Sequence, residues 1–145
     1  MKWIDIPPVW LALCLVLTWL SGALWQAGHP LLSVVGTGLV VLGLALMVAA
    51  VWEMARRRTT PIPHMQPSAL VSSGVFGLSR NPIYLGDALV LIGLALRWHA
   101  PLGLLLVPLF VWVIHRRFIF AEEARLSAAF GAEFDAYRRR TRRWI

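Results

Sequence analysis

The chain has 145 residues, of which 59% are hydrophobic and 14% charged, and its formal net charge is +7. Long uncharged runs separated by short charged clusters indicate one polytopic membrane domain over residues 1–145, without room for a separate soluble domain of ordinary size. The arginines cluster at the ends of apolar segments rather than on a solvated face, so the positive charge does not predict nucleic-acid binding.

The first two apolar runs, at about residues 6–25 and 31–53, are each long enough to cross the hydrocarbon layer as a helix. A cleaved signal peptide is an alternative for the first run, because Lys2 precedes it, although Asp5 and the bulky aromatic residues argue against it. The arginine cluster at 56–58 places the end of the second run in the cytoplasm, on the same side as Lys2.

The third and fourth runs, at about 82–97 and 100–118, are short for a full crossing and predict a tight hairpin that turns around Arg97. Basic clusters flank the pair on both outer sides, so the hairpin returns the chain to the cytoplasm. We therefore expect an all-α membrane protein with about four transmembrane helices. Its cytoplasmic parts are both termini, a loop at 59–81 and a tail at 119–145, and the membrane that we expect is a bacterial inner membrane.

The end of the cytoplasmic loop combines a glycine, Gly74, with a fixed charge, Arg80, and the step Asn81-Pro82. Asn is favoured as a helix cap and Pro at the first helical position, so a helix is predicted to begin here with the Asn81 side chain as its cap. The N-terminus of that helix, next to Arg80 and Tyr84, suits an anionic group such as a carboxylate.

The tail carries Leu126 and Phe130 at helical spacing, interrupted by Gly131, which predicts two short amphipathic helices at the membrane surface. Glu122 shares a face with Leu126 and Phe130, and a carboxylate beside an apolar stripe is costly unless it is paired. Its candidate partners are Arg80, Arg116 and Arg117. The alternative is a surface salt bridge at a helix start.

Asp87 is the one acid inside the third apolar run, and ionisable groups at such positions are functional candidates. Tyr84 lies three residues earlier, so the two could share a polar pocket, with Asp87 in a supporting role. His64 in the cytoplasmic loop is a weak functional candidate. The four histidines are isolated from one another, so no metal site is predicted.

Two blocks of the sequence resemble a known family. GVFGLSRNPIYLG, from Gly74 to Gly86, resembles the glycine, aromatic and Arg-(His/Asn)-Pro-x-Tyr signature of the isoprenylcysteine carboxyl methyltransferases, a family similar to the phospholipid N-methyltransferases. EEARLSAAFGAEFDAY, from Glu122 to Tyr137, resembles the block that closes the core of that family. The resemblance covers roughly half of the chain. Ser68 and Asn81 stand where the eukaryotic members have histidine.

The resemblance implies a membrane methyltransferase that uses S-adenosylmethionine and a lipophilic acceptor entering from the bilayer, among membrane lipids and without a metal. The implied reaction is O-methylation of an isoprenylcysteine-like or other lipid-borne carboxylate, which needs no general base. The implied catalytic residues are Arg116, Arg117 and Glu122. The implied cofactor-binding residues are Ser68, Ala69, Leu70, Val71, Gly74, Phe76, Arg80, Asn81, Pro82, Ile83, Tyr84, Glu122 and Glu123.

Three alternatives stay open at this point. A phospholipid or amine N-methyltransferase would need a base near Glu122 to accept a neutral amine. A non-enzymatic four-span transporter would be expected to carry a central acid, and Asp87 lies nearer the interface than that role requires. A membrane scaffold would use its arginines for headgroups alone.

Overall fold

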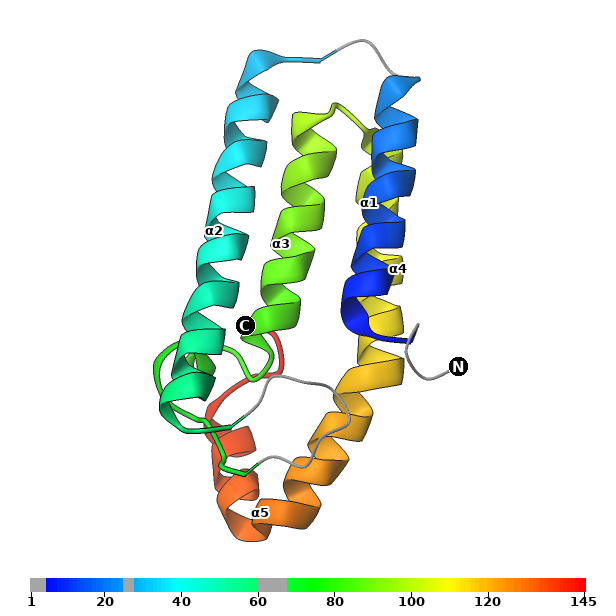
Figure 1. Cartoon of the computed structure of the whole chain (residues 1–145). Coiled ribbons are helices and arrows are strands. Elements are labelled where there is room, and N and C mark those ends of the chain that lie inside the picture. Colours follow the sequence, from blue (N-terminus) through cyan, green and yellow to red (C-terminus); the bar gives the residue numbers. More distant parts are fainter. Residues whose placement is uncertain (1–4, 25–27, 60–67) are drawn as a thin grey trace.

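The computed structural model describes residues 5–24, 28–59 and 68–145, and over these residues the protein is all-helical (Figure 1). Lys2 and His64 lie outside the described residues. The elements are α1 (Pro7–Ala23), α2 (Pro30–Arg56), the 3₁₀ helix η1 (Gly74–Gly77), α3 (Pro82–Arg97), α4 (Pro101–Ile114), the π-helix η2 (His115–Ile119) and α5 (Phe120–Arg140). The predicted all-α fold is confirmed.

Helices α1 to α4 run alternately up and down, and α5 folds beneath the end of the bundle where α1 begins and α2 ends (Figure 1). Helix α3 is central: it packs against α1, α2 and α4, and α1 also packs against α4. Large exposed apolar side chains lie on α1, α2 and α4 but not on α3. The outer helices therefore present the apolar surface that a bilayer would cover.

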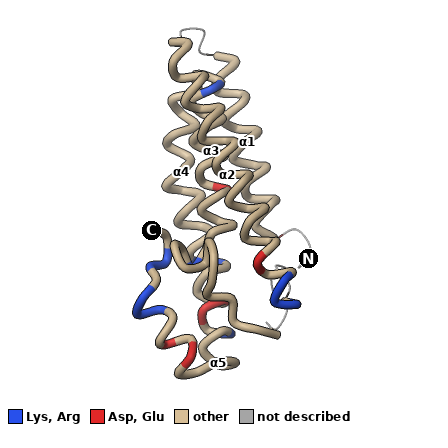
Figure 2. Tube along the Cα trace, turned by 90° about the vertical axis from the view of Figure 1, so that its left-hand side faces the viewer, with Lys and Arg blue, Asp and Glu red and all other residues tan. Residues whose placement is uncertain are grey.

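Among the described residues, two helical segments are long and apolar enough to cross a membrane, Pro30–Arg56 and Pro101–Arg140, and Pro7–Ala23 is a shorter apolar helix. Four membrane crossings therefore stay a prediction. Basic residues gather at the end of the bundle that carries α5 (Figure 2). The positive-inside rule associates such an end with the cytoplasm, and the orientation in the membrane stays a prediction.

Helix α2 approaches α3 closely because glycines of the two helices face each other. A Cβ placed on Gly43 would lie 2.7 Å from the carbonyl oxygen of Gly86, and one on Gly93 would lie 2.6 Å from that of Gly36. A side chain at either position would force the backbones apart. This contact fixes α2 against the wall of the cavity described below.

The predicted hairpin between α3 and α4 is confirmed. Helix α3 ends at Arg97 and α4 begins at Pro101, and His99 between them takes a left-handed conformation with φ 52°. The Arg97 Nη1 donates a hydrogen bond to the Thr37 hydroxyl on α2, at 2.8 Å. This contact ties the hairpin tip to the neighbouring helix.

Two departures from regular α-helix, at η2 and at Gly131, accompany the return of α5 beneath the bundle. The π-helix η2 lengthens the turn between α4 and α5, and this changes which residues of α5 face the bundle. Gly131 then breaks α5 with φ 47° and ψ −117°, which confirms the predicted interruption. Beyond the break, Phe134 and Tyr137 pack with Val71 and Phe76 of the segment between α2 and α3.

Candidate functional site

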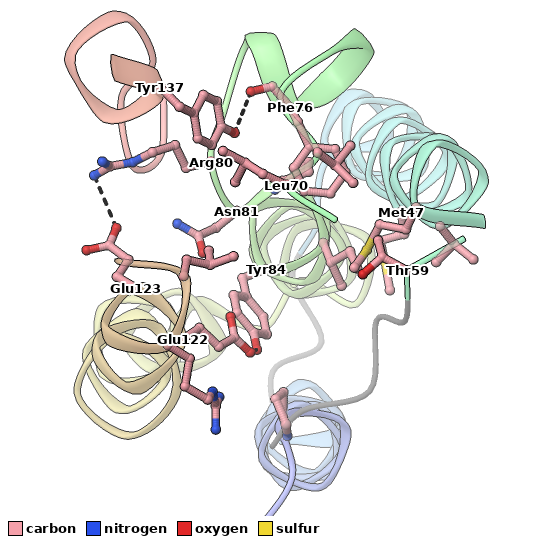
Figure 3. Close-up of a pocket in the computed structure, with 18 of the residues that line it drawn as sticks. Met47, Thr59, Leu70, Phe76, Arg80, Asn81, Tyr84, Glu122, Glu123 and Tyr137 are labelled. Atoms are coloured by element: carbon pink, nitrogen blue, oxygen red, sulfur yellow. Dashed lines mark hydrogen bonds and ion pairs between the residues drawn. The ribbon is translucent and has the colours of Figure 1, made fainter. Parts of the chain in front are cut away.

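A cavity of about 320 Å³ lies where α5 closes the end of the bundle (Figure 3). Its walls come from the start of α1, the last turns of α2, the segment 69–81, the first turns of α3, and α5. The lining residues are Pro7, Pro8, Met47, Val51, Met54, Thr59, Ala69, Leu70, Val71, Phe76, Arg80, Asn81, Pro82, Ile83, Tyr84, Asp87, Glu122, Glu123, Arg125, Leu126, Phe134 and Tyr137.

The start of α3 forms one edge of this cavity. The helix begins at Pro82 as predicted, but the predicted cap by Asn81 is wrong, because the Asn81 side chain makes no capping hydrogen bond. Its Nδ2 instead donates to the carbonyl oxygen of Arg143, at 2.9 Å, and its backbone N–H donates to the Ser79 hydroxyl, at 3.1 Å. The Asn81 side chain therefore binds the C-terminal segment instead of capping α3.

The two adjacent glutamates at the start of α5 have different partners. The Tyr84 hydroxyl donates to Oε1 of Glu122, at 2.6 Å. The Arg80 Nη2 lies 3.1 Å from Oε1 of Glu123. Both carboxylates line the cavity (Figure 3), and Arg80 forms an ion pair with the second glutamate, whereas the sequence analysis offered Arg80 as a partner of the first.

Glu123 also receives a guanidinium from the C-terminal tail. Arg143 donates from Nε to Oε1 at 2.9 Å and from Nη2 to Oε2 at 2.6 Å. Its Nη1 lies 2.8 Å from Nε2 of His115. The hydrogen bonds to Glu123 raise the pKa of Arg143, so this guanidinium stays charged. No local signal predicts this contact, because Arg143 is one of several arginines between residues 138 and 143 and nothing in the pattern distinguishes it from the others.

Two polar atoms in this region have no hydrogen-bond partner within the described residues: the Nε of Arg80 and the hydroxyl oxygen of Thr59. Both residues line the cavity, and both atoms are buried. Buried polar atoms in folded proteins are nearly always satisfied. These two atoms therefore indicate where a bound molecule would supply hydrogen bonds.

Asp87 lines the cavity from α3 and is 4% exposed. It lies about 8 Å along the helix axis from Pro82. Within the described ranges no side chain donates a hydrogen bond to its carboxylate. Tyr84 lines the same cavity, so the predicted shared pocket is present.

The cavity brings together most of the cofactor-binding residues predicted from the sequence. Those that line it are Ala69, Leu70, Val71, Phe76, Arg80, Asn81, Pro82, Ile83, Tyr84, Glu122 and Glu123. Ser68 does not line it: this residue is exposed and its hydroxyl donates to the carbonyl oxygen of Arg58, at 2.8 Å. Gly74 does not line it either, and its φ of 56° brings its backbone against the Glu53 side chain.

Neither of the predicted catalytic arginines lines the cavity. Arg116 and Arg117 are exposed in η2. Arg117 pairs with Asp5 at 2.7 Å and lies over the Trp10 ring, 5.3 Å from its centroid. The extra residue in the π-helical turn gives a physical reason, because it changes the face of the helix on which these arginines lie. Arg125 lines the cavity in their place.

Sequence reasoning missed the contributions from other elements. Arg125 had a local signal, since it lies three residues after Glu122 and so on the same helical face. Met47, Val51 and Met54 of α2 had none, because an apolar residue in an apolar helix carries no mark of facing a cavity. Their placement depends on the glycine contact between α2 and α3.

Comparison with curated proteins and with solved structures finds no match. Comparison with protein families finds one: the model of the family described as phospholipid methyltransferase matches residues 31–133. The matched segment includes α2, α3, α4, the loop between α2 and α3, and both glutamates of the cavity. Since it covers well over half of the sequence, the chain belongs to the phospholipid methyltransferase family, a family of membrane methyltransferases.

Proposed function

We propose that this protein transfers a methyl group from S-adenosylmethionine to a lipid-borne acceptor, at the end of the bundle closed by α5. The observation that carries the proposal is the cavity, which joins the two blocks of the family signature around a set of charged and unsatisfied polar groups. Its volume of about 320 Å³ lies at the lower end of the usual range for small-molecule sites.

The residues present fit this cofactor. The unsatisfied Nε of Arg80 and the α3 N-terminus suit its carboxylate, and the Thr59 hydroxyl suits a polar edge such as a ribose hydroxyl. The apolar side chains of Val71, Phe76 and Phe134 would cover the adenosine. When bound, the cofactor would supply an electrophilic methyl group on a positively charged sulfur.

The acceptor that the geometry favours is a lipid amine. Asp87 is a buried carboxylate without a hydrogen-bond donor among the described residues, and it lines the same cavity as Met47 and Val51 of α2. A carboxylate in such a place is stabilised by a cation. We expect Asp87 to bind the amine head of the acceptor and to take, at a carboxylate oxygen, the proton that the ammonium form must lose before its nitrogen can attack the methyl carbon.

A lipid carboxylate is the second candidate, as the resemblance to isoprenylcysteine carboxyl methyltransferases implies. Arg125 supports it, because this residue lines the same cavity and would neutralise an anionic head. In that reaction no proton needs to be removed. The chain's residues would then act by orienting the acceptor and excluding water.

The test is transfer of a labelled methyl group from S-adenosylmethionine to two acceptors in mixed micelles, phosphatidylethanolamine and a farnesylated cysteine with a free carboxylate. We expect methylation of the amine lipid, and at least a tenfold lower rate in Asp87→Asn. Methylation of the carboxylate alone, unaffected by Asp87→Asn, would replace the first candidate with the second. Transfer to neither acceptor, with folded protein and bound cofactor, would contradict both acceptor assignments.

A matched measurement separates the acceptor from the cofactor. Asp87 could also stabilise the positive sulfur of S-adenosylmethionine, and S-adenosylhomocysteine lacks that charge. If Asp87 serves the acceptor, Asp87→Asn changes the affinities for the two cofactor forms by the same factor. A loss confined to S-adenosylmethionine would assign Asp87 to the sulfonium instead.

A further inference from the structure

We infer that Glu123 and Arg143 are positioning residues that hold Arg80 for the carboxylate of the cofactor, and that Glu123 is not itself a cofactor ligand. This inference rests on the proposed function and changes the role that the family resemblance implied for Glu123. It makes the C-terminal segment a part of the binding site.

Both oxygens of the Glu123 carboxylate contact guanidinium groups of the protein. Its Oε1 faces both Arg80 Nη2, at 3.1 Å, and Arg143 Nε, at 2.9 Å, and its Oε2 accepts from Arg143 Nη2, at 2.6 Å. A two-pronged guanidinium contact fixes a carboxylate in one plane as well as in position. Both oxygens of Glu123 are thus engaged within the protein, and its side chain is 18% exposed.

The cluster of Arg80, Glu123 and Arg143 has an excess of positive charge. Arg80 and Arg143 are each positive and Glu123 is negative, so the three side chains carry a net charge of about +1. His115 accepts from the Arg143 Nη1 in this geometry, which requires an unprotonated Nε2 and adds no charge. A net positive cluster beside a helix N-terminus favours an anion over the cofactor's ammonium group.

The Nε of Arg80 is a buried donor without a partner among the described residues. The Arg80 side chain is 11% exposed, and one edge of its guanidinium contacts Glu123, while its buried Nε has no partner among the described residues. Without Glu123 and Arg143, this long side chain would lose the contact that fixes its orientation (Figure 3). A carboxylate that accepts from Nε would satisfy the atom that the fold leaves unpaired.

The segment that carries Arg143 is anchored by its backbone, independently of this side chain. The Arg80 N–H donates to the carbonyl oxygen of Arg142, at 3.0 Å. The side chains of Asn81 and Ser79 both donate to the backbone carbonyl oxygen of Arg143, at 2.9 and 3.3 Å. Removing the Arg143 side chain should therefore leave the segment in place and change only the hold on Glu123.

The experiment compares two ligands by calorimetry on the detergent-purified full chain. S-adenosylhomocysteine has the amino-acid end, and 5′-methylthioadenosine keeps the adenosine and the thioether without it. We expect Arg143→Met to weaken the binding of S-adenosylhomocysteine by about ten- to a hundredfold, by analogy with the loss of supporting partners at metal sites, and to leave the binding of 5′-methylthioadenosine unchanged. Arg143→Lys should restore part of the loss, and Arg142→Met, which removes a neighbouring exposed charge, should change neither affinity.

Glu123→Gln separates the two roles of the glutamate. If Glu123 positions Arg80, this variant and Arg143→Met lose S-adenosylhomocysteine to a similar degree. If Glu123 bound the ammonium group directly, Glu123→Gln would lose affinity while Arg143→Met, by releasing the acid, would keep or gain it, and this overturns the inference. Equal weakening of both ligands in Arg143→Met also overturns it, since that marks general disruption. A wild-type protein that binds 5′-methylthioadenosine but not S-adenosylhomocysteine refutes this inference alone, whereas binding of neither refutes the proposed function as well.

Discussion

Tyr84 and Glu122 connect the central helix to the closing helix across the cavity, through a hydrogen bond of 2.6 Å from the hydroxyl to Oε1. The ring of Tyr84 packs in the buried cluster with Leu91 and Ile114. One side chain therefore belongs both to the core of the bundle and to the candidate site. Removing its hydroxyl should therefore affect both the stability of the bundle and ligand binding at the candidate site.

Tyr84→Phe keeps the ring and removes the hydroxyl. Because hydrogen bonds to charged groups contribute about 1.5–3 kcal/mol, we expect the free energy of unfolding to fall by about that amount while helical content is unchanged. Thermal unfolding in detergent, followed by circular dichroism, measures the change. The pair Tyr84→Phe and Glu122→Gln should be non-additive in a double-mutant cycle, and simple additivity would argue that the two groups do not interact.

The glycine contact between α2 and α3 yields a matched pair of variants on one helix. A Cβ at Gly43 would lie 2.7 Å from the Gly86 carbonyl oxygen, whereas one at Gly38 would meet nothing within 4 Å. Gly43→Ala should destabilise the protein by about 1–3 kcal/mol through overpacking. Gly38→Ala should be neutral or stabilising by up to about 1 kcal/mol, because Ala is the better helix former. Equal melting temperatures would contradict the close helix contact.

Tyr137 should make the stability of the folded protein depend on pH in the alkaline range. Its hydroxyl donates to the Phe76 carbonyl oxygen at 2.7 Å, and burial raises the pKa of Tyr137 to about 12 from 10.0, against the opposing effect of Arg80 and Arg140. The folded protein thus holds this proton when the unfolded chain has lost it. Stability from this group is fully present below pH 10 and is lost as the pH rises from 10 to about 12.

In that window stability should fall by about 1.4 kcal/mol for each pH unit on account of Tyr137. Other groups also titrate at alkaline pH, so the measured quantity is the difference in melting temperature between the wild type and Tyr137→Phe. We expect this difference to be constant below pH 10 and to shrink above it. A difference that is independent of pH would contradict the assignment.

Local signals in the sequence predicted much of the site. The Asn81-Pro82 step marked the start of α3, Gly131 marked the break in α5, and the two family blocks indicated the segments that meet at the cavity. These features depend on the conformational limits of single residues. They can therefore be read without knowing what packs against them.

Features that depend on tertiary contacts could not be predicted in this way. The Asn81 side chain turns to the Arg143 carbonyl rather than to its own helix, because the chain terminus returns to that point. Arg116 and Arg117 lie in the π-helical turn at 115–119 and do not line the cavity, whereas a regular helix would have been the default assumption from the sequence. The number of membrane crossings stays a prediction, because α1 and α3 are short.

The central claim is that the cavity binds S-adenosylmethionine, and calorimetric binding of S-adenosylhomocysteine to the detergent-purified protein tests it most directly. We predict saturable binding that is lost in Arg80→Ala and in Glu122→Ala, and retained in Arg138→Ala, where an exposed arginine outside the cavity is removed. No binding to well-folded wild-type protein across several lipids, or equal binding by all four proteins, would contradict the account.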